Sequence, residues 1–338
     1  MKIALMSFAH THASSYARAL RDRPGIELMT SDPLAGTRPA HETGGATMAA
    51  ELGVPYVDSY DELMAWDPDG VIICSENARH RADTERAAAV GAHVLCEKPL
   101  ATTTDDAAAM IAACDAARIR LMVAYPVRYS PAFTALHDAY AAGELGTLRA
   151  LHGTNNGSVP SGGRAWFVDP ELAGGGGLID HVVHLADLID TLLGHVSAEE
   201  VYASANSLMP GADTGVETAA HVSVRYPGGV IATIDSSWSV PRSGPTWGGL
   251  TLDAVGDSGF ASMDAFNQRV DGFSEAEKRP VWLSYGFNLD ELMINTFLGV
   301  VEGAEPPVDG RAGFRSMAVA LAALESARTG QPVAVPTP

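Results

Sequence analysis

The chain has 338 residues, of which 46% are hydrophobic and 19% are charged, values typical of a folded water-exposed protein. This length is long for one hydrophobic core and predicts two domains. The net charge of −19 argues against a nucleic-acid partner or an anionic membrane surface. No window approaches the roughly 20 apolar residues of a membrane span. Residues 1–20 do not resemble a signal peptide, and the three cysteines lack C-x-x-C spacing, so we expect a cytoplasmic protein with reduced thiols.

Residues 1 to about 124 alternate short apolar runs with longer amphipathic stretches. This alternation predicts an α/β fold with a parallel sheet that is covered on both faces. The predicted strands are Lys2–Ser7, Ile26–Ser31, Val54–Val57, Gly70–Cys74, His93–Cys96 and Arg120–Ala124. The predicted helices are His12–Arg21, Gly44–Leu52, Arg79–Val90 and Thr104–Ala117.

The first strand-to-helix turn is where such a fold holds a dinucleotide pyrophosphate, on the N–H groups of a helix N-terminus. The usual fingerprint there is G-x-G-x-x-G. This chain instead has Ser7-Phe8-Ala9-His10-Thr11-His12. Serine and alanine still permit close backbone approach, and only a position that needs positive φ would be strained. His10 and His12 either donate to a phosphate or cap the following helix.

Two further loops follow strands on the same edge. Asp32 ends the second strand, where a carboxylate accepts from an adenosine ribose and repels a 2′-phosphate, so NAD is favoured over NADP. The alternatives are a simple turn role for Asp32 and a phosphate-binding role for Arg38. Ser75, Asn77 and His80 either contact the cofactor or cap the next helix.

Glu97-Lys98-Pro99 ends the strand at His93–Cys96. Proline cannot donate to a sheet ladder, so the strand stops there. Lys98 is thereby placed at a carboxyl end, the edge where open α/β sheets bind ligands. The alternative is a surface salt bridge beside a turn proline.

A second polar group follows the glycine run Gly174–Gly177. Asp180 and His184 are separated by four residues at the start of a predicted helix and therefore share one face. A carboxylate one turn from an imidazole can hold its tautomer and raise its basicity. The alternatives are a His–Asp pair that joins two domains, or a metal site that also uses His181 and Asp187.

Beyond residue 125 the pattern changes. A helix at Ser130–Ala142 is followed by alternating runs that predict a large, mostly antiparallel open sheet, with one face against helices and the other free for a second subunit. These strands are Ala198–Leu208, Thr218–Tyr226, Gly229–Ser239 and Leu250–Val255, with a hairpin turn at Pro227–Gly229. Helices at Leu289–Val301 and Gly310–Arg328 end the chain.

Glu97-Lys98-Pro99, the glycine run before Asp180 and His184, and the 75–80 loop together resemble the Gfo/Idh/MocA family of NAD(P)-dependent oxidoreductases. The resemblance continues through residues 128–131 (Arg-Tyr-Ser-Pro), 216–218 (Val-Glu-Thr) and 325–330 (Glu-Ser-Ala-x-x-Gly), so it covers nearly the whole chain. It implies a Rossmann domain over residues 1–124 and an α/β domain over 125–338. The second domain would bind substrate and form a homodimer or homotetramer through its sheet.

The resemblance also implies roles for individual residues. Lys98 would reach both nicotinamide and substrate, His184 would take a hydroxyl proton from a cyclic sugar or polyol, and Asp180 would orient His184. The implied cofactor contacts are Ser7, Phe8, Ala9, His10, His12, Asp32, Ser75, Asn77, His80, Glu97 and Lys98. The implied substrate contacts are Lys98, Arg128, Arg164, Trp166, Asp180 and His184, and no metal is assigned. Arg164 and Trp166 can equally be packing residues. The missing glycines, and Glu76 where the family has proline, depart from the pattern.

Two other hypotheses stay open. A family member that has lost catalysis would sense a nucleotide or sugar, and the altered turn favours that reading. A metal-dependent hydrolase would use His10 and His12 as amidohydrolase barrels use a similar pair.

Overall fold

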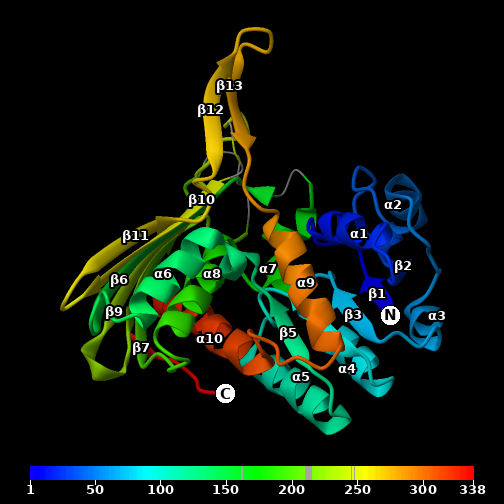
Figure 1. The fold of residues 1–338 in the computed structure, drawn as a ribbon, viewed down its shortest axis with the longest axis horizontal. Coiled ribbons are helices and arrows are strands. Elements are labelled where there is room, and N and C mark those ends of the chain that lie inside the picture. Colours follow the sequence, from blue (N-terminus) through cyan, green and yellow to red (C-terminus); the bar gives the residue numbers. More distant parts are fainter. Residues whose placement is uncertain (161–162, 210–214, 245, 247) are drawn as a thin grey trace.

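The computed structural model describes residues 1–160, 163–209, 215–244, 246 and 248–338. Two β-sheets organise the chain, with the N-terminal sheet and the C-terminal sheet on opposite sides of a central group of helices (Figure 1). Among the helices described, none is both long enough and apolar enough to cross a membrane.

The N-terminal sheet has five parallel strands in the order β2-β1-β3-β4-β5. These are β1 (Lys2–Met6), β2 (Glu27–Ser31), β3 (Gly70–Ile73), β4 (His93–Glu97) and β5 (Leu121–Ala124). Its helices are α1 (Ala13–Arg21), α2 (Gly45–Leu52), α3 (Tyr60–Ala65), α4 (His80–Ala89) and α5 (Thr104–Ala117). The predicted parallel sheet is confirmed. Because the sheet is open, it excludes the barrel that the metal-hydrolase hypothesis required.

One predicted strand in this half is wrong. Residues 54–57 form a single bridge, between Thr30 and Tyr56, instead of a strand. Pro55 has no N–H to donate, and its carbonyl accepts from the Thr30 N–H at 3.0 Å. The chain then turns into α3, a short helix that the sequence analysis did not predict.

The C-terminal sheet has seven strands in the order β11-β10-β6-β9-β8-β7-β14. Its pairs are antiparallel except β6 with β9, which are parallel. The strands are β6 (Leu148–Gly157), β7 (Glu200–Asn206), β8 (Ala219–Arg225), β9 (Ile231–Ser237), β10 (Gly248–Gly256), β11 (Phe260–Asp264) and β14 (Val333–Ala334). The mostly antiparallel sheet was predicted, but β6 was not, since its second half is Gly-Thr-Asn-Asn-Gly.

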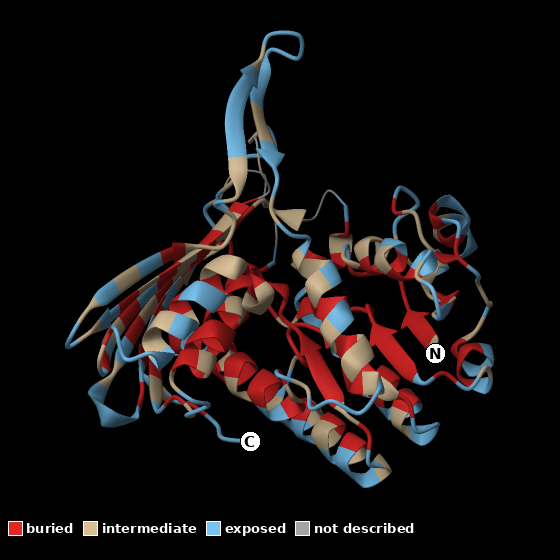
Figure 2. Cartoon of the chain, in the orientation of Figure 1, coloured by how far each residue is buried: buried red, intermediate tan, exposed pale blue. Residues whose placement is uncertain are grey.

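Helices cover one face of this sheet. They are α6 (Pro131–Ala141), α8 (Gly177–Leu192) and α10 (Gly310–Thr329), with the short α7 (Pro170–Ala173) before α8. Residues along β8 alternate between buried and exposed, so its other face meets solvent in the single chain (Figure 2). This arrangement leaves room for the predicted subunit interface, and the oligomeric state stays a prediction.

The last part of the chain returns to the N-terminal sheet. Helix α9 (Leu289–Val301) contributes Met293, Ile294, Phe297 and Val300 to the core around β1. Before it, β12 (Arg269–Ser274) and β13 (Arg279–Ser284) pair into a hairpin that projects from the body (Figure 1). Most of this hairpin is exposed, and it was not predicted.

The glycine run places α8. Glu217 accepts the Gly176 N–H at 2.7 Å and the Leu178 N–H at 3.2 Å through one carboxylate oxygen, and its carbonyl accepts the Gly177 N–H at 2.9 Å. A Cβ at Gly176 would overlap that same carbonyl oxygen. The glycines therefore let the start of α8 lie directly on residues 216–218, and a half-buried acid satisfies its free N–H groups.

This contact predicts that Gly176→Ala destabilises the protein, by about 1–3 kcal/mol or more, because the Glu217 backbone must move. Urea denaturation would measure the loss. Gly249→Ala is the matched control, since nothing lies within 4 Å of its added Cβ, and it should leave stability almost unchanged. Equal stability of the two variants would contradict this account of the glycine run.

Candidate active site

A cavity of about 840 Å³ lies at the carboxyl ends of β1 and β4, where the two halves of the chain meet. Its lining residues include His10, His12, Lys98, Asp180, His181 and His184. Most of the remaining wall comes from residues 155–160, 246, 250–268 and 282–290 of the C-terminal half. The N-terminal sheet and α8 therefore present their polar side chains to one common space.

Lys98 and Asp180 form an ion pair in this space. Lys98 Nζ lies 2.6 Å from Asp180 Oδ1, and the Lys98 side chain is only 5% exposed. Asp180 Oδ2 accepts the Trp238 indole N–H at 3.2 Å and lies 3.2 Å from His181 Nε2. Burial alone would raise the pKa of Asp180, but Lys98 and His181 outweigh burial and hold that pKa well below its usual range. Asp180 is thus an ionised carboxylate, and both of its oxygens contact other side chains.

His184 lies one turn further along α8 and has a different environment from the one predicted. Both Asp180 oxygens face other groups, and His184 Nδ1 is buried with no hydrogen-bond partner among the described residues. The prediction that Asp180 orients His184 by a hydrogen bond is therefore wrong in this structure. The His184 ring instead meets Tyr125 edge-on, with centroids 5.8 Å apart. Burial, followed by the charge of Lys98, lowers the pKa of His184 well below its usual value, so the ring is neutral.

The sequence analysis missed two residues of the cavity. His181 Nδ1 donates to the Asn155 carbonyl at 2.9 Å, and Asn155 Nδ2 donates to the His181 carbonyl at 3.1 Å. Helical spacing suggested that His181 points away from His184. The position of His181 next to Asp180 in the sequence could have indicated that it belongs to the site. Its partner Asn155 could not be found in this way, because it lies on β6, a strand that was not predicted.

The turn from β1 to α1 is closed by its own side chains. Ser7 has a φ of 70°, a conformation that usually requires glycine. Its hydroxyl donates to Asp32 at 3.1 Å and accepts the Ala9 N–H at 3.1 Å. The His10 N–H donates to the Cys74 carbonyl, and the His12 N–H donates to His10 Nδ1. Several N–H groups of the turn are therefore already bonded within the protein.

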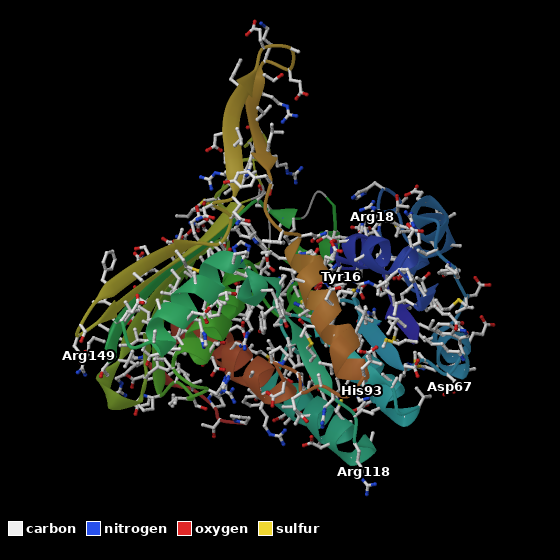
Figure 3. The ribbon with its side chains drawn as sticks, in the orientation of Figure 1. Tyr16, Arg18, Asp67, His93, Arg118 and Arg149 are labelled. Carbon is white, nitrogen blue, oxygen red and sulfur yellow. The ribbon has the colours of Figure 1, made fainter. Side chains whose placement is uncertain are left out.

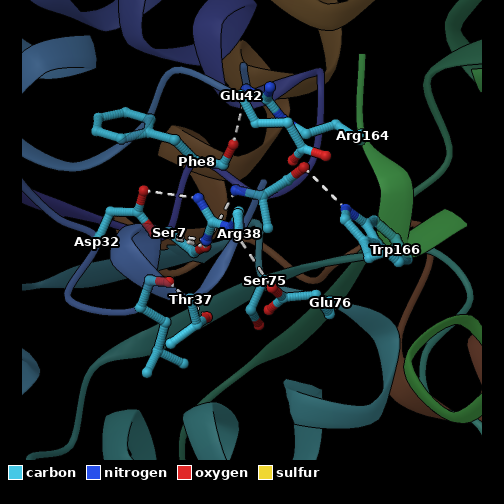
Figure 4. A network of polar contacts seen from close by, with 12 residues as sticks. Ser7, Phe8, Asp32, Thr37, Arg38, Glu42, Ser75, Glu76, Arg164 and Trp166 are labelled. Atoms are coloured by element: carbon cyan, nitrogen blue, oxygen red, sulfur yellow. Dashed lines mark hydrogen bonds and ion pairs between the residues drawn. The ribbon is translucent and has the colours of Figure 1, made fainter. Parts of the chain in front are cut away.

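Asp32 lies beneath this turn, and Arg38 binds it with two nitrogens at 2.7 and 2.8 Å (Figure 4). The same guanidinium lies 3.5 Å from Glu76. Asp32 also accepts the Gly45 N–H at 2.8 Å. Burial would raise the pKa of Asp32, but Arg38 and the backbone donors lower it. The charge of Arg38 is balanced by two carboxylates at this corner.

Arg164 and Trp166 contact the turn instead of the sugar pocket assigned to them. Arg164 donates to the Phe8 carbonyl at 3.1 Å, and Trp166 donates to the Ala9 carbonyl at 2.9 Å (Figure 4). Neither lines the 840 Å³ cavity, whereas their neighbour Phe167 does. The assignment of Arg164 and Trp166 to a sugar pocket therefore does not fit this geometry.

The 75–80 loop is held by internal hydrogen bonds. Ser75 donates to Asp83 at 2.7 Å, and Asn77 donates to the Ala173 carbonyl at 2.9 Å. His80 is fully buried, with ring nitrogens 3.0 Å from the Pro99 carbonyl and 3.2 Å from the Ser75 carbonyl. The His80 side chain therefore supports the strand ends and does not line the cavity.

Glu97 lies under the turn with both histidines. His12 Nδ1 is 3.0 Å and His10 Nδ1 is 3.5 Å from Glu97 Oε1, which also accepts the Tyr16 hydroxyl at 2.6 Å. Burial would raise the pKa of Glu97, but the two histidines lower it far below its usual range. Burial lowers the pKa of His10 to about 3, whereas Glu97 overcomes burial and raises the pKa of His12.

Two protein-family models match this chain, one in each half. Residues 9–125 match the oxidoreductase family with an NAD-binding Rossmann fold, and residues 133–262 match the GFO/IDH/MocA C-terminal domain. The chain belongs to the Gfo/Idh/MocA oxidoreductase family. The family assigned from the sequence motifs is thus confirmed.

Characterised relatives of this Gfo/Idh/MocA protein extend over most of its length. It is 31% identical to 1,5-anhydro-D-fructose reductase of Ensifer adhaerens, over 87% of this chain and 88% of that protein. It is also 31% identical to D-xylose 1-dehydrogenase (NADP(+)) 2 of Haloferax volcanii, over 86% of this chain and 89% of the relative. The structure of GenD2 from gentamicin A biosynthesis, in complex with NAD, shares the fold with a TM-score of 0.87 at 23% identity, covering 100% of this chain and 97% of that one.

Arg128, the remaining family motif residue assigned to substrate, lies elsewhere. Its guanidinium forms a two-point ion pair with Asp187 at 2.6 and 3.1 Å and donates to the Pro307 carbonyl at 2.8 Å. Both side chains are buried, at 8% and 0% exposure, and Arg128 does not line the cavity. The structure therefore does not support the assignment of Arg128 to substrate. The Arg128–Asp187 ion pair instead joins the segment that follows β5 to α8.

Arg128→Ala should lower the free energy of unfolding by about 3–5 kcal/mol, because it leaves the Asp187 carboxylate buried without a partner. The loss should shrink in acid, since burial already raises the pKa of Asp187 and protonation removes the unpaired charge. Chemical denaturation at two pH values would measure both effects.

Arg149→Ala is the control for this variant. Arg149, near the start of β6, forms an exposed ion pair with Asp257 (Figure 3), so its loss should cost about 0–1 kcal/mol. An Arg128→Ala protein of unchanged stability with a raised KM would return Arg128 to the substrate site.

Proposed function

We propose that this protein is an NAD-dependent oxidoreductase that interconverts a carbinol and a carbonyl carbon of a cyclic sugar, polyol or sugar derivative. The observation that carries the proposal is the largely buried Lys98–Asp180 pair in one cavity with a neutral His184, whose Nδ1 has no hydrogen-bond partner among the residues described. Relatives named for anhydrofructose, xylose and apiose support the substrate class. Residues 1–124 would hold the cofactor, and residues 125–338 would hold the substrate, with α9 returning to the first domain.

The residues present fit the nicotinamide end of a dinucleotide. The cavity adjoins the β1–α1 turn and contains the buried His184 Nδ1, which lacks a partner among the described residues, and the Lys98 ammonium. When bound, the nicotinamide ring would accept or supply the hydride. Asp32 and Ser7 would hold the adenosine end, the turn at residues 7–12 the phosphates, and Lys98 the nicotinamide side.

Side chains of the protein would take up the proton that the substrate hydroxyl releases. His184 is neutral, so it can take the substrate hydroxyl proton as a general base. Lys98 would donate a hydrogen bond to the developing alkoxide and stabilise its charge in a largely water-excluded site. Asp180 would hold the ammonium in place through the 2.6 Å ion pair and so act as a positioning residue.

Replacing His184 with Asn should lower turnover by about 10²–10⁴-fold, because it removes the neutral ring that would accept the hydroxyl proton. Lys98→Ala should cost a comparable factor. Single-turnover hydride transfer, read by nicotinamide absorbance with a panel of sugars, would measure both. His137→Ala, an exposed histidine, should change nothing, and a folded His184→Asn protein with near wild-type turnover would remove His184 from the mechanism.

Asp180→Asn should shift the acid limb of the kcat/KM profile to lower pH at a reduced rate. The Asp180 carboxylate favours the charged form of His184, so removing it lowers the pKa of that histidine further. The neutral base then persists in more acidic solution. A variant that loses melting temperature and activity together, with an unmoved acid limb, would show that Asp180 only supports the fold.

NAD should bind more tightly than NADP, because Asp32 and Glu76 already balance the charge of Arg38, which is then not free to bind a 2′-phosphate. Arg38→Ala uncovers both carboxylates and should raise the NAD-to-NADP affinity ratio by about tenfold or more. Calorimetric titration of both cofactors would test this, with the more exposed Arg79→Ala as control.

Other outcomes of that titration have clear meanings. Tighter NADP binding that Arg38→Ala reverses would show that Arg38 reads the 2′-phosphate. If neither cofactor binds, the bonded N–H groups of the β1–α1 turn have closed the site, and the sugar-sensing alternative takes its place.

The three free, buried cysteines are consistent with a reducing cytoplasm as the place of action.

A further inference from the structure

His10, His12 and Glu97 converge from two strands at one point beneath the cavity. Each offers one ligand atom, and these three atoms lie within 4.8 Å of one another. His10 and His12 follow β1, and Glu97 ends β4, so 85 residues of sequence separate His12 from its carboxylate. We propose that His10, His12 and Glu97 form a binding site for a divalent transition metal of the zinc type.

The spacing of the ligand atoms suits such an ion. Bonds of 2.0–2.1 Å in a tetrahedral site place neighbouring ligand atoms about 3.3 Å apart. The two histidine nitrogens lie 3.0 and 3.5 Å from Glu97 Oε1. Two imidazoles and one carboxylate are also a ligand set that zinc and iron(II) sites use, with further positions left to water or substrate.

The hydrogen bonds around the cluster leave only part of it free: His10 Nδ1 accepts the His12 N–H at 3.2 Å, and an ion bound at that nitrogen would replace this hydrogen bond. Lys98 Nζ pairs with Asp180, so the ammonium beside Glu97 does not occupy that carboxylate. His10 is 2% exposed, yet its Nε2 has no hydrogen-bond partner in the part of the chain that the structure describes. This nitrogen is on the opposite side of the ring from Nδ1, which lies 3.5 Å from Glu97, so it shows that the His10 ring is not held by hydrogen bonds at both nitrogens and does not itself belong to the spacing given above.

Neighbouring residues hold the Glu97 carboxylate in place and leave a route by which an ion can reach it. The Tyr16 hydroxyl donates to Glu97 Oε1 at 2.6 Å and fixes the carboxylate, as groups behind a metal ligand commonly do. Tyr16 lies on α1 at the junction with α9, deep in the molecule (Figure 3). The His12 side chain is 32% exposed, and both histidines line the cavity, which gives an ion a route in and an open coordination position.

This site does not depend on the proposed hydride transfer and can be tested without measuring activity. Tag-free full-length protein, stripped with a chelator, would be titrated with Zn²⁺ by calorimetry and with Co²⁺ by visible absorption. We expect one equivalent of Zn²⁺ at micromolar or tighter Kd, a raised melting temperature, and the bands of four- or five-coordinate cobalt.

Variants connect the ion to these residues. His12→Gln and Glu97→Gln should each weaken Zn²⁺ binding by more than about 100-fold, and Tyr16→Phe by about 10-fold. His12→Gln is the safer of the two ligand variants, because its side chain is partly exposed. His152→Gln, on the exposed face of β6, is the control and should bind Zn²⁺ like the wild type.

The alternative is a metal-free ion pair between His12 and Glu97. Absence of Zn²⁺ and Co²⁺ binding at micromolar concentration would establish that alternative and overturn the proposal. Binding that persists unchanged in the folded His12→Gln protein would also overturn it, because the ion would then lie elsewhere. Either result would leave the proposed oxidoreductase activity to be judged by its own experiments.

Discussion

The ion pair between Lys98 and Asp180 is the contact on which the rest of the site depends. It joins the end of β4 to the first turn of α8, so it links the two halves of the chain across their common cavity. A largely buried ammonium and carboxylate are stable together only when both are well paired, and removal of either partner leaves a costly buried charge. The fold accordingly fixes both sides: Pro99 ends the strand beyond Lys98, and Glu217 holds the start of α8 below Asp180.

Charged and neutral groups occupy distinct positions in and directly beneath the cavity. Glu97 is an anion beside His12, Lys98 is a cation beside Asp180, and His10 and His184 are neutral because burial disfavours their charged forms. Each charged group has a partner within 3.0 Å, while each neutral ring keeps a nitrogen that has no hydrogen-bond partner within the described part of the chain. The arrangement separates groups that hold their neighbours in place from groups that remain free to exchange a proton or bind an ion.

The features that could be predicted from the sequence are those that depend on residues close together in the chain. Thr104–Ala117 was predicted with its observed bounds, because Thr103 caps the helix and acids follow in its first turn. Pro99 likewise predicted the strand end at Cys96, one residue before the observed end at Glu97. Contacts between distant segments could not be read in this way: an arginine in a motif looks the same whether it meets a substrate or, like Arg128, a buried aspartate 59 residues away. The same holds for Asp180, whose spacing from His184 was correct while its actual partner, Lys98, lies 82 residues earlier.

The turn after β1 shows how a fold can keep a geometry without its usual sequence. Glycine would allow the positive φ at this position at no cost, whereas Ser7 adopts it at a cost of about 1–2 kcal/mol. The Ser7 hydroxyl offsets that cost by bonding both Asp32 and the Ala9 N–H. Arg164 and Trp166, from the other half of the chain, then hold the Phe8 and Ala9 carbonyls. Side chains therefore replace glycine here, and because two of them come from the C-terminal domain, the shape of the turn depends on how the two halves of the protein meet.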